Sequence, residues 1–131
     1  MDLKMTTKTA NLFGIGNDMI EIARVRRVVE MFHMRFLNRV FTRNECAYCF
    51  SYKDPIPRFA ARFAGKEAVA KALGTGIGEK LFWHDIEILN TPEGKPVVQL
   101  SSKVSQKGSL QVLLSLSHCK AYASAMALCT M

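Results

Sequence analysis

Phe63-Ala64-Gly65-Lys66-Glu67-Ala68-Val69-Ala70-Lys71-Ala72-Leu73-Gly74-Thr75-Gly76 lies within the strongest helical segment of this chain. The helix is expected to run over Arg58–Leu73, opened by two prolines and ended by the Gly74-Thr75-Gly76 turn. Apolar side chains recur with a helical period along one face, and Glu67 and Lys71 lie one turn apart at its margin. The segment therefore predicts a largely buried helix that carries a carboxylate and an ammonium group at its edge.

A second segment, Gly14-Ile15-Gly16-Asn17-Asp18-Met19-Ile20-Glu21, places another carboxylate among apolar residues. It is expected to lie in a strand over Leu12–Ile22, in which Gly14 and Gly16 allow close approach of a neighbouring backbone. A carboxylate inside such a strand must be paired, hydrogen-bonded or bound to a metal to stay charged. Asp18 is therefore a candidate site residue.

The rest of the chain predicts two more helices and then a strand-rich half. The helices are Val25–Phe36 and Arg43–Tyr52, the second capped by Thr42 with Glu45 at the capping-box position. The elements expected beyond these are strands at His84–Leu89, Pro96–Leu100, Leu110–Ser117 and Tyr122–Leu128, a turn at Thr91–Gly94 and a short helix at Ser101–Gln106. Helices and strands do not alternate, so we expect an α+β fold, a single domain in which an antiparallel sheet packs with one long central helix and shorter helices.

The composition is that of one globular domain with excess positive charge. The 131 residues are 49% hydrophobic, enough for a core, and carry a formal net charge of +7. We expect the domain over residues 13–131, after a flexible N-terminal extension over residues 1–12. Much of the positive charge lies between Arg24 and Arg43, which indicates either a face for an anionic partner or an ordinary solvated helix surface.

Targeting and redox features favour the cytoplasm. No apolar run is long enough to span a bilayer, and the first twelve residues lack the apolar core of a signal peptide. Without an export signal, the four cysteines are expected to be reduced thiols. Cys46 and Cys49 have a redox or zinc spacing, but they lie in an expected helix and there is no second pair, so we assign them no role.

Asp18 and Glu67 together predict a magnesium site. Mg²⁺ is usually held by one or two protein carboxylates together with phosphate oxygens of the substrate and water, and Lys71 could neutralise a transferring phosphate. Each group also has a plainer interpretation. Backbone amides or an arginine could satisfy Asp18, and Glu67 with Lys71 could form a surface ion pair.

Two further features stay open. The turn Gly74-Thr75-Gly76-Ile77-Gly78 could present amides to a phosphate, but it lacks the ending of a P-loop and a helix C-cap is the more economical explanation. His118 follows an apolar strand, where it could act as a base, contact a phosphate or simply end the strand.

Taken in order, these motifs make the chain resemble the holo-[acyl-carrier-protein] synthases, the short bacterial type of 4'-phosphopantetheinyl transferase. The resemblance covers Phe13 to Leu128. It rests on the motifs at residues 14–21 and 62–78, and on Asp85-Ile86-Glu87-Ile88, Gly94-Lys95-Pro96 and Ser115-Leu116-Ser117-His118. One position departs, because Gly65 stands where the family has alanine.

The resemblance implies a reaction. The 4'-phosphopantetheine arm of coenzyme A moves to a serine of an apo acyl carrier protein, in support of fatty acid biosynthesis, and adenosine 3',5'-bisphosphate leaves. Asp18 and Glu67 would hold Mg²⁺ against the coenzyme A pyrophosphate. Glu67, directly or through a metal-bound water, would also help to deprotonate the serine, and Lys71 would stabilise or protonate the leaving phosphate.

The same resemblance implies binding contacts and a quaternary structure. The positions that match the family around coenzyme A are Lys66, Lys71, Lys95, Pro96 and His118. Arg24 matches a position that docks the carrier, whose acidic surface would be steered by the cationic region. A homotrimer with active sites shared between neighbouring subunits is implied, with no nucleic-acid or membrane partner.

Two alternatives belong to other functional classes. A basic nucleic-acid-binding module would explain the charge, but the sequence has no zinc finger and no RNA-binding aromatic motif. A catalytically idle subunit that binds coenzyme A would keep the same motifs without modifying a carrier.

Overall fold

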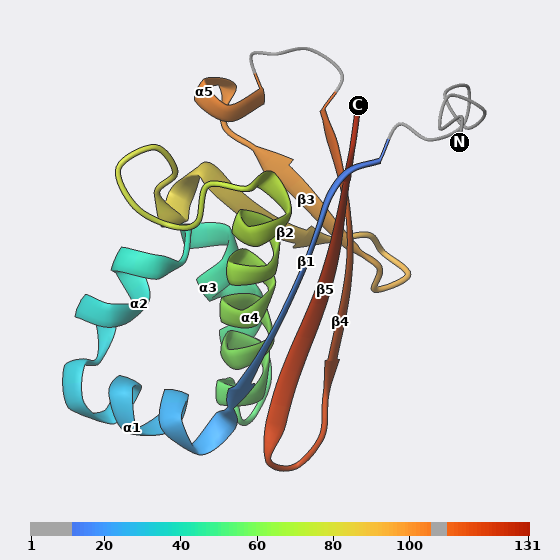
Figure 1. The fold of residues 1–131 in the computed structure, drawn as a ribbon. Coiled ribbons are helices and arrows are strands. Elements are labelled where there is room, and N and C mark those ends of the chain that lie inside the picture. The colour runs from blue at the N-terminus through green and yellow to red at the C-terminus, as the bar shows by residue number, and fades with distance from the viewer. Residues whose placement is uncertain (1–11, 106–109) are drawn as a thin grey trace, which may run out of the picture.

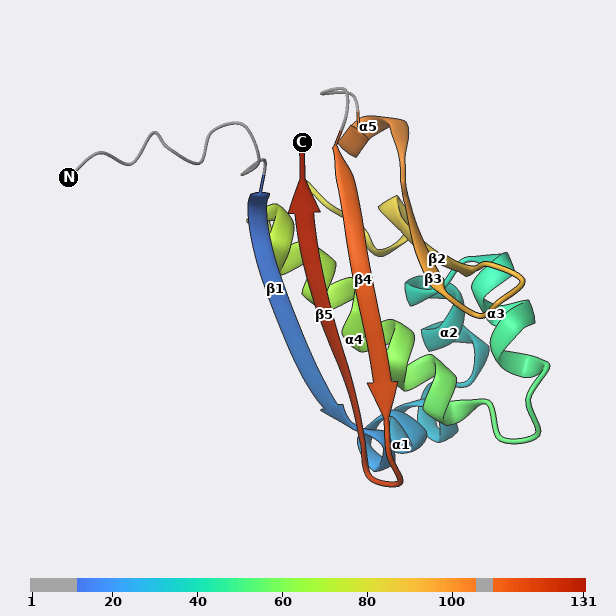
Figure 2. The same cartoon turned by 90° about the vertical axis from the view of Figure 1, so that its right-hand side faces the viewer.

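The structure, a computed structural model, describes residues 12–105 and 110–131. The expected N-terminal extension lies outside the described residues, apart from Leu12, which is the first residue of a strand. The chain has the expected α+β architecture, with antiparallel sheets and one long helix between the larger sheet and the shorter helices (Figures 1 and 2).

The long helix α4 (Ile56–Leu73) packs across one face of a three-stranded antiparallel sheet (Figure 2). The sheet has the order β1 (Leu12–Glu21), β5 (Tyr122–Thr130), β4 (Gln111–His118). The central strand turns small, buried side chains toward the helix, namely Ala123, Ala125, Ala127 and Cys129. Small residues on this face let the helix lie close to the sheet.

Two glycines bring β1 into direct contact with α4. A Cβ atom at Gly14 would lie 1.9 Å from the carbonyl oxygen of Ala72, and one at Gly16 would lie 2.1 Å from that of Ala68. Any side chain would therefore push the strand off the helix. The predicted close approach is confirmed, and it sets the distance between the two elements that carry Asp18 and Glu67.

Helices α1 (Ile22–Phe32) and α2 (Met34–Val40) lie on the other side of α4 from the sheet (Figure 1). The prediction of one continuous helix over Val25–Phe36 is wrong, because the chain breaks at His33. The backbone of this residue has φ 52° and ψ −136°, a region that residues with a Cβ rarely adopt. Beyond the break, Phe36 of α2 packs against Phe63 of α4.

Helix α3 (Arg43–Phe50) begins with the predicted capping box. The Thr42 hydroxyl accepts from the amide of Glu45, and the Glu45 carboxylate accepts from the amide of Thr42 at 2.8 Å. The helix ends at Phe50, two residues before the expected end.

Strands β2 (Ile86–Asn90) and β3 (Pro96–Leu100) form a separate hairpin, closed by the predicted turn at Thr91–Gly94. The strand expected from His84 begins later, because Trp83–Asp85 form a 3-10 turn, η2. The Asp85 carboxylate accepts from the amide of Phe82 and holds this turn in place. Helix α5 (Ser102–Ser105) follows, and Gln106, the last residue of the helix expected here, lies outside the described residues.

The buried core lies on both flanks of α4. One cluster joins α4 to α1, α2 and α3, and the other joins it to the sheets. The polar side chains buried in this interior include those of Glu45, Arg62 and Lys66. Among the described residues, none of the helices has the length and apolar character needed to cross a membrane.

Candidate active site

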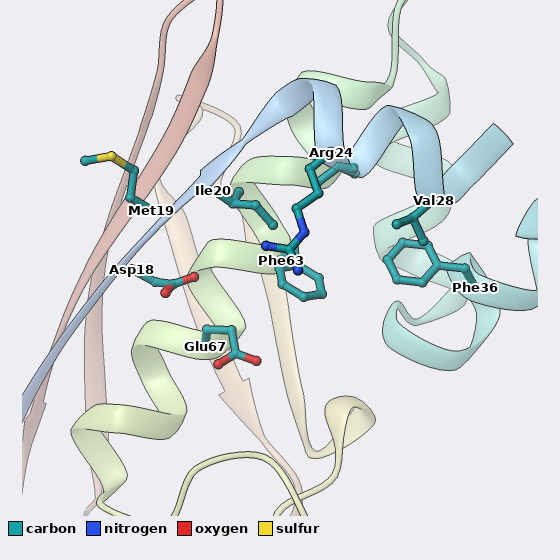
Figure 3. A pocket seen from close by; sticks show the side chains of 9 residues that line it. Asp18, Met19, Ile20, Arg24, Val28, Phe36, Phe63 and Glu67 are labelled. Atoms are coloured by element: carbon teal, nitrogen blue, oxygen red, sulfur yellow. The ribbon is translucent and has the colours of Figure 1, made fainter. Parts of the chain in front are cut away.

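Asp18 and Glu67 line the same cavity, of about 330 Å³ (Figure 3). Asp18 reaches it from β1 and Glu67 from α4. Gly16 and Ala68, one or two residues from these carboxylates, form one of the two close contacts between these elements. The other lining residues are Met19, Ile20, Arg24, Val25, Val28, Phe36 and Phe63.

The two carboxylates influence each other. Burial raises the pKa of the Glu67 carboxyl, the negative charge of Asp18 raises it further, and the positive charge of Lys71 opposes both effects. A cation placed between the carboxylates would relieve this repulsion. In residues 12–105 and 110–131, this site included, no group of three or more His, Cys, Asp or Glu side chains is arranged to hold a metal, so the site offers two carboxylates. A pair of carboxylates fits Mg²⁺, which takes its other ligands from phosphates and water.

Lys71 lies at the boundary between this cavity and a second groove. Its ammonium donates to the carbonyl oxygen of Asn17 at 2.9 Å and to the Asp18 carboxylate at 3.2 Å. The side chain is 51% exposed, so the ammonium is open to a ligand from solvent. The groove, of about 420 Å³, also contains Ser115, Ser117 and Ser124.

The simple ion pair between Glu67 and Lys71 is absent from the described part of the chain, because Lys71 pairs with Asp18 instead. This arrangement places one ammonium and two carboxylates around the edge strand β1. Asp18 and Met19 line both the cavity and the groove, so the two hollows meet at this strand.

Aromatic residues that the sequence did not single out as site residues form one wall of the cavity. The Phe63 ring lies 6.3 Å from that of Phe36 and 5.1 Å from that of Trp83, measured between centroids. Phe63 was expected on the apolar stripe of the helix, but Phe36 belongs to α2 and reaches the site only because of the break at His33. Arg24 extends toward this wall (Figure 3).

The structure corrects the expected role of Lys66. Its side chain has no exposed surface, and its ammonium lies 2.7 Å from the equally buried carboxylate of Glu45. The ammonium also donates to the carbonyl oxygens of Val40 and Trp83. With all three donors occupied in the core, Lys66 does not reach a nucleotide from this position.

Three other expected contacts lie away from the cavity. Lys95 and Pro96 line a groove between β3 and β4. His118 is exposed at the end of β4, opposite Ala123 of β5. Within one chain, the structure therefore does not bring these residues to the Asp18 and Glu67 carboxylates.

The glycine turn after α4 and the pair Cys46 and Cys49 have structural roles. Gly74, with φ 81°, caps α4, and its amide donates to the carbonyl oxygen of Lys71. Cys46 and Cys49 are buried free thiols, and burial raises the pKa of Cys49 to about 12. Both preferred interpretations from the sequence are confirmed.

Comparison with known proteins decides the family. The sequence profile of the 4'-phosphopantetheinyl transferase superfamily matches residues 14–127. This chain belongs to that superfamily. The match spans β1 and α4, and therefore includes Asp18, Glu67 and Lys71.

Relatives in the 4'-phosphopantetheinyl transferase superfamily resemble the chain over most of its length. The holo-[acyl-carrier-protein] synthase of Chlamydia felis is 55% identical over 114 residues, which are 86% of this chain and 93% of the relative. Two solved structures extend the likeness to the fold. The Helicobacter pylori holo-[acyl-carrier-protein] synthase, in complex with coenzyme A, has a TM-score of 0.82 and 35% identity, and covers 88% of this chain and 99% of its own. The Neisseria meningitidis enzyme of the same name has a TM-score of 0.83 and 31% identity, and covers 92% of this chain and 99% of its own.

Proposed function

We propose that this protein transfers the 4'-phosphopantetheine group of coenzyme A to a serine of an apo acyl carrier protein, releasing adenosine 3',5'-bisphosphate. Names of the relatives and the coenzyme A complexes of similar structures support this reaction. The observation that carries the proposal is that Asp18 shares the cavity with Glu67 and pairs with Lys71 at the adjoining groove.

Asp18 and Glu67 would hold Mg²⁺. When bound, this ion neutralises charge on the pyrophosphate of coenzyme A. In the reaction, the serine oxygen forms a bond to the phosphorus that bears pantetheine, and the bond from this phosphorus to the oxygen of the adenosine bisphosphate breaks. Glu67 accepts the serine proton, because its carboxylate lines the cavity where the serine would enter. The Lys71 ammonium stabilises the phosphate that leaves.

The carrier would dock over α1 and α2. Arg24 of α1 lines the cavity beside the carboxylates, so a carrier that presents its serine there would lie against α1. The cationic region over residues 24–43 would attract an acidic carrier surface and accelerate its association.

The outer face of the three-stranded sheet supports a homotrimer. Exposed apolar side chains gather on the face opposite α4, namely Ile15, Met19, Leu113 and Met126. A contiguous apolar patch on a surface is typical of a protein interface. Met19 also lines the cavity, so a copy of the chain packed on this face would lie beside the site. We place such a trimer in the cytoplasm.

The direct test is the intact mass of an apo acyl carrier protein incubated with this protein, coenzyme A and Mg²⁺. A gain of one phosphopantetheine that disappears with EDTA is expected. Asp18→Ala and Glu67→Ala variants that remain folded should give almost no product. Coenzyme A binding without a mass gain on several carriers would instead support an idle binding subunit.

A further inference from the structure

Lys66 and Glu45 form an ion pair that is entirely buried. The atoms Nζ and Oε1 are 2.7 Å apart, and neither side chain has exposed surface. The ammonium has three donors and three acceptors, which are Glu45, the carbonyl oxygen of Val40 at 2.7 Å and that of Trp83 at 3.1 Å. The carboxylate of Glu45 also accepts from the amides of Thr42 and Ile88. Every charge in this network is satisfied.

The network connects segments that are distant in the sequence. Val40 ends α2, Thr42 caps α3, Trp83 begins η2 and Ile88 lies in β2. All of them are tied to α4 through one ammonium group. Buried ion pairs contribute little net stability, because desolvation cancels much of the attraction, so stability is a weak explanation for this pair.

Geometry provides a stronger explanation. Lys66 immediately precedes Glu67 in α4, and the same stretch of helix carries Phe63. The network holds α2 and η2 by their backbones, and these two elements supply Phe36 and Trp83, the two rings that contact Phe63. The two elements that bind the Lys66 ammonium, α2 and η2, are therefore also the elements whose aromatic rings pack against Phe63.

We infer that the Lys66–Glu45 pair is a positioning device for the candidate active site. It sets the rotation of α4 about its axis and the position of α2, and it thereby aims Glu67 at Asp18. Lys66 and Glu45 are positioning residues, since neither lines the cavity. This inference rests on the proposed function, because the alignment serves catalysis only if Asp18 and Glu67 form the active site.

The test follows the alignment itself through the binding of Mn²⁺, used here as a probe ion for the two carboxylates. Asp18 and Glu67 line the same cavity, so a cation that both carboxylates hold should bind more weakly when they are misaligned. The variant to measure is Glu45→Gln/Lys66→Met, which removes the ion pair and leaves the summed charge of the two side chains at zero. The Kd for Mn²⁺, measured by the EPR signal of the free ion, should rise at least about fivefold (~1 kcal/mol).

A matched control separates positioning from stability. Val69→Ala removes buried side-chain volume from α4 without touching the ion pair, so it should lower the melting temperature and leave the Kd for Mn²⁺ unchanged. If the double variant does not fold, Glu45→Asp provides a milder change that keeps both charges and shortens the acceptor. A Kd for Mn²⁺ equal to that of the wild type in either folded variant would overturn the inference. Absence of transfer by the wild-type protein would refute the proposed function and leave this binding measurement unaffected.

Discussion

The ammonium of Lys71 donates to the carboxylate of Asp18 across 3.2 Å, which joins α4 to the edge strand β1 where the cavity and the serine-lined groove meet. This contact leaves the Glu67 carboxylate without its expected helical partner. It therefore assigns different tasks to two groups that lie one helical turn apart, with Glu67 on the cavity side and Lys71 on the groove side.

Lys71→Met should slow transfer without preventing coenzyme A binding. Loss of the ammonium removes charge stabilisation of the leaving phosphate. We therefore expect kcat to fall about 100-fold or more. Release of adenosine 3',5'-bisphosphate, followed by liquid chromatography, measures this rate. Lys80→Met, at an exposed position after α4, is the matched control and should keep wild-type activity. Equal rates for the two variants would remove Lys71 from the mechanism.

Glu67→Gln should stabilise the metal-free protein at neutral pH. Because the pKa of Glu67 is raised by folding, the folded state holds more protons than the unfolded state between the ordinary and the raised value. Wild-type stability therefore falls as the pH rises through that window, and the variant escapes this loss. Urea unfolding in EDTA should show the variant as more stable at pH 7 and equal to wild type below about pH 4. Glu79→Gln, at an exposed site, should show no such dependence.

Gly65→Ala should gain helix propensity and meet a local steric limit. A Cβ at this position would lie 2.8 Å from Cδ1 of Ile88 and 3.1 Å from Cδ2 of Leu116, both ends of flexible side chains. The propensity gain of about 1 kcal/mol should be partly offset by this crowding. In an Ile88→Val background, which removes the Cδ1 atom, the full gain should appear. Free energies of unfolding from urea titrations of the four proteins measure the coupling, and a zero coupling energy would contradict the contact.

His33→Gly should stabilise the fold. The backbone at this position, with φ 52° and ψ −136°, costs a residue with a Cβ about 1–3 kcal/mol. Glycine removes this strain but gains entropy in the unfolded chain, which leaves a net increase of about 1 kcal/mol in the free energy of unfolding. Thermal unfolding followed by circular dichroism measures the change. His33→Ala retains a Cβ and serves as the control, so a comparable stabilisation in that variant would refute the strain explanation.

Leu113→Arg should dissociate the proposed homotrimer. Leu113 is 55% exposed on the apolar outer face of the sheet, and a charge there would be costly to bury between subunits. Sedimentation velocity should show trimers for the wild type and monomers for the variant. Met31→Arg, at an exposed position on α1, should leave the trimer intact. A wild-type protein that sediments as a monomer would refute the trimer.

Local sequence was enough to predict the features that depend only on residues close together in the chain. The capping box of Thr42 and Glu45 and the glycine C-cap at Gly74 depend on residues within one helical turn, and both were predicted. The close contact of β1 with α4 could also be expected, because glycines within a strand allow another backbone to approach closely. Asp18, Glu67 and Lys71 were identified by their residue types and by the motifs around them.

Only the tertiary structure decided the features that depend on distant partners. Lys66 looks like a binding residue in sequence, but Glu45, Val40 and Trp83 surround its ammonium and bury it. Phe36 joins the cavity wall through a backbone conformation at His33 that no local pattern indicates. The sequence by itself determined which groups could carry the chemistry. Folding decided which of them face the cavity and which hold it in shape, because burial and pairing depend on contacts between segments far apart in the chain.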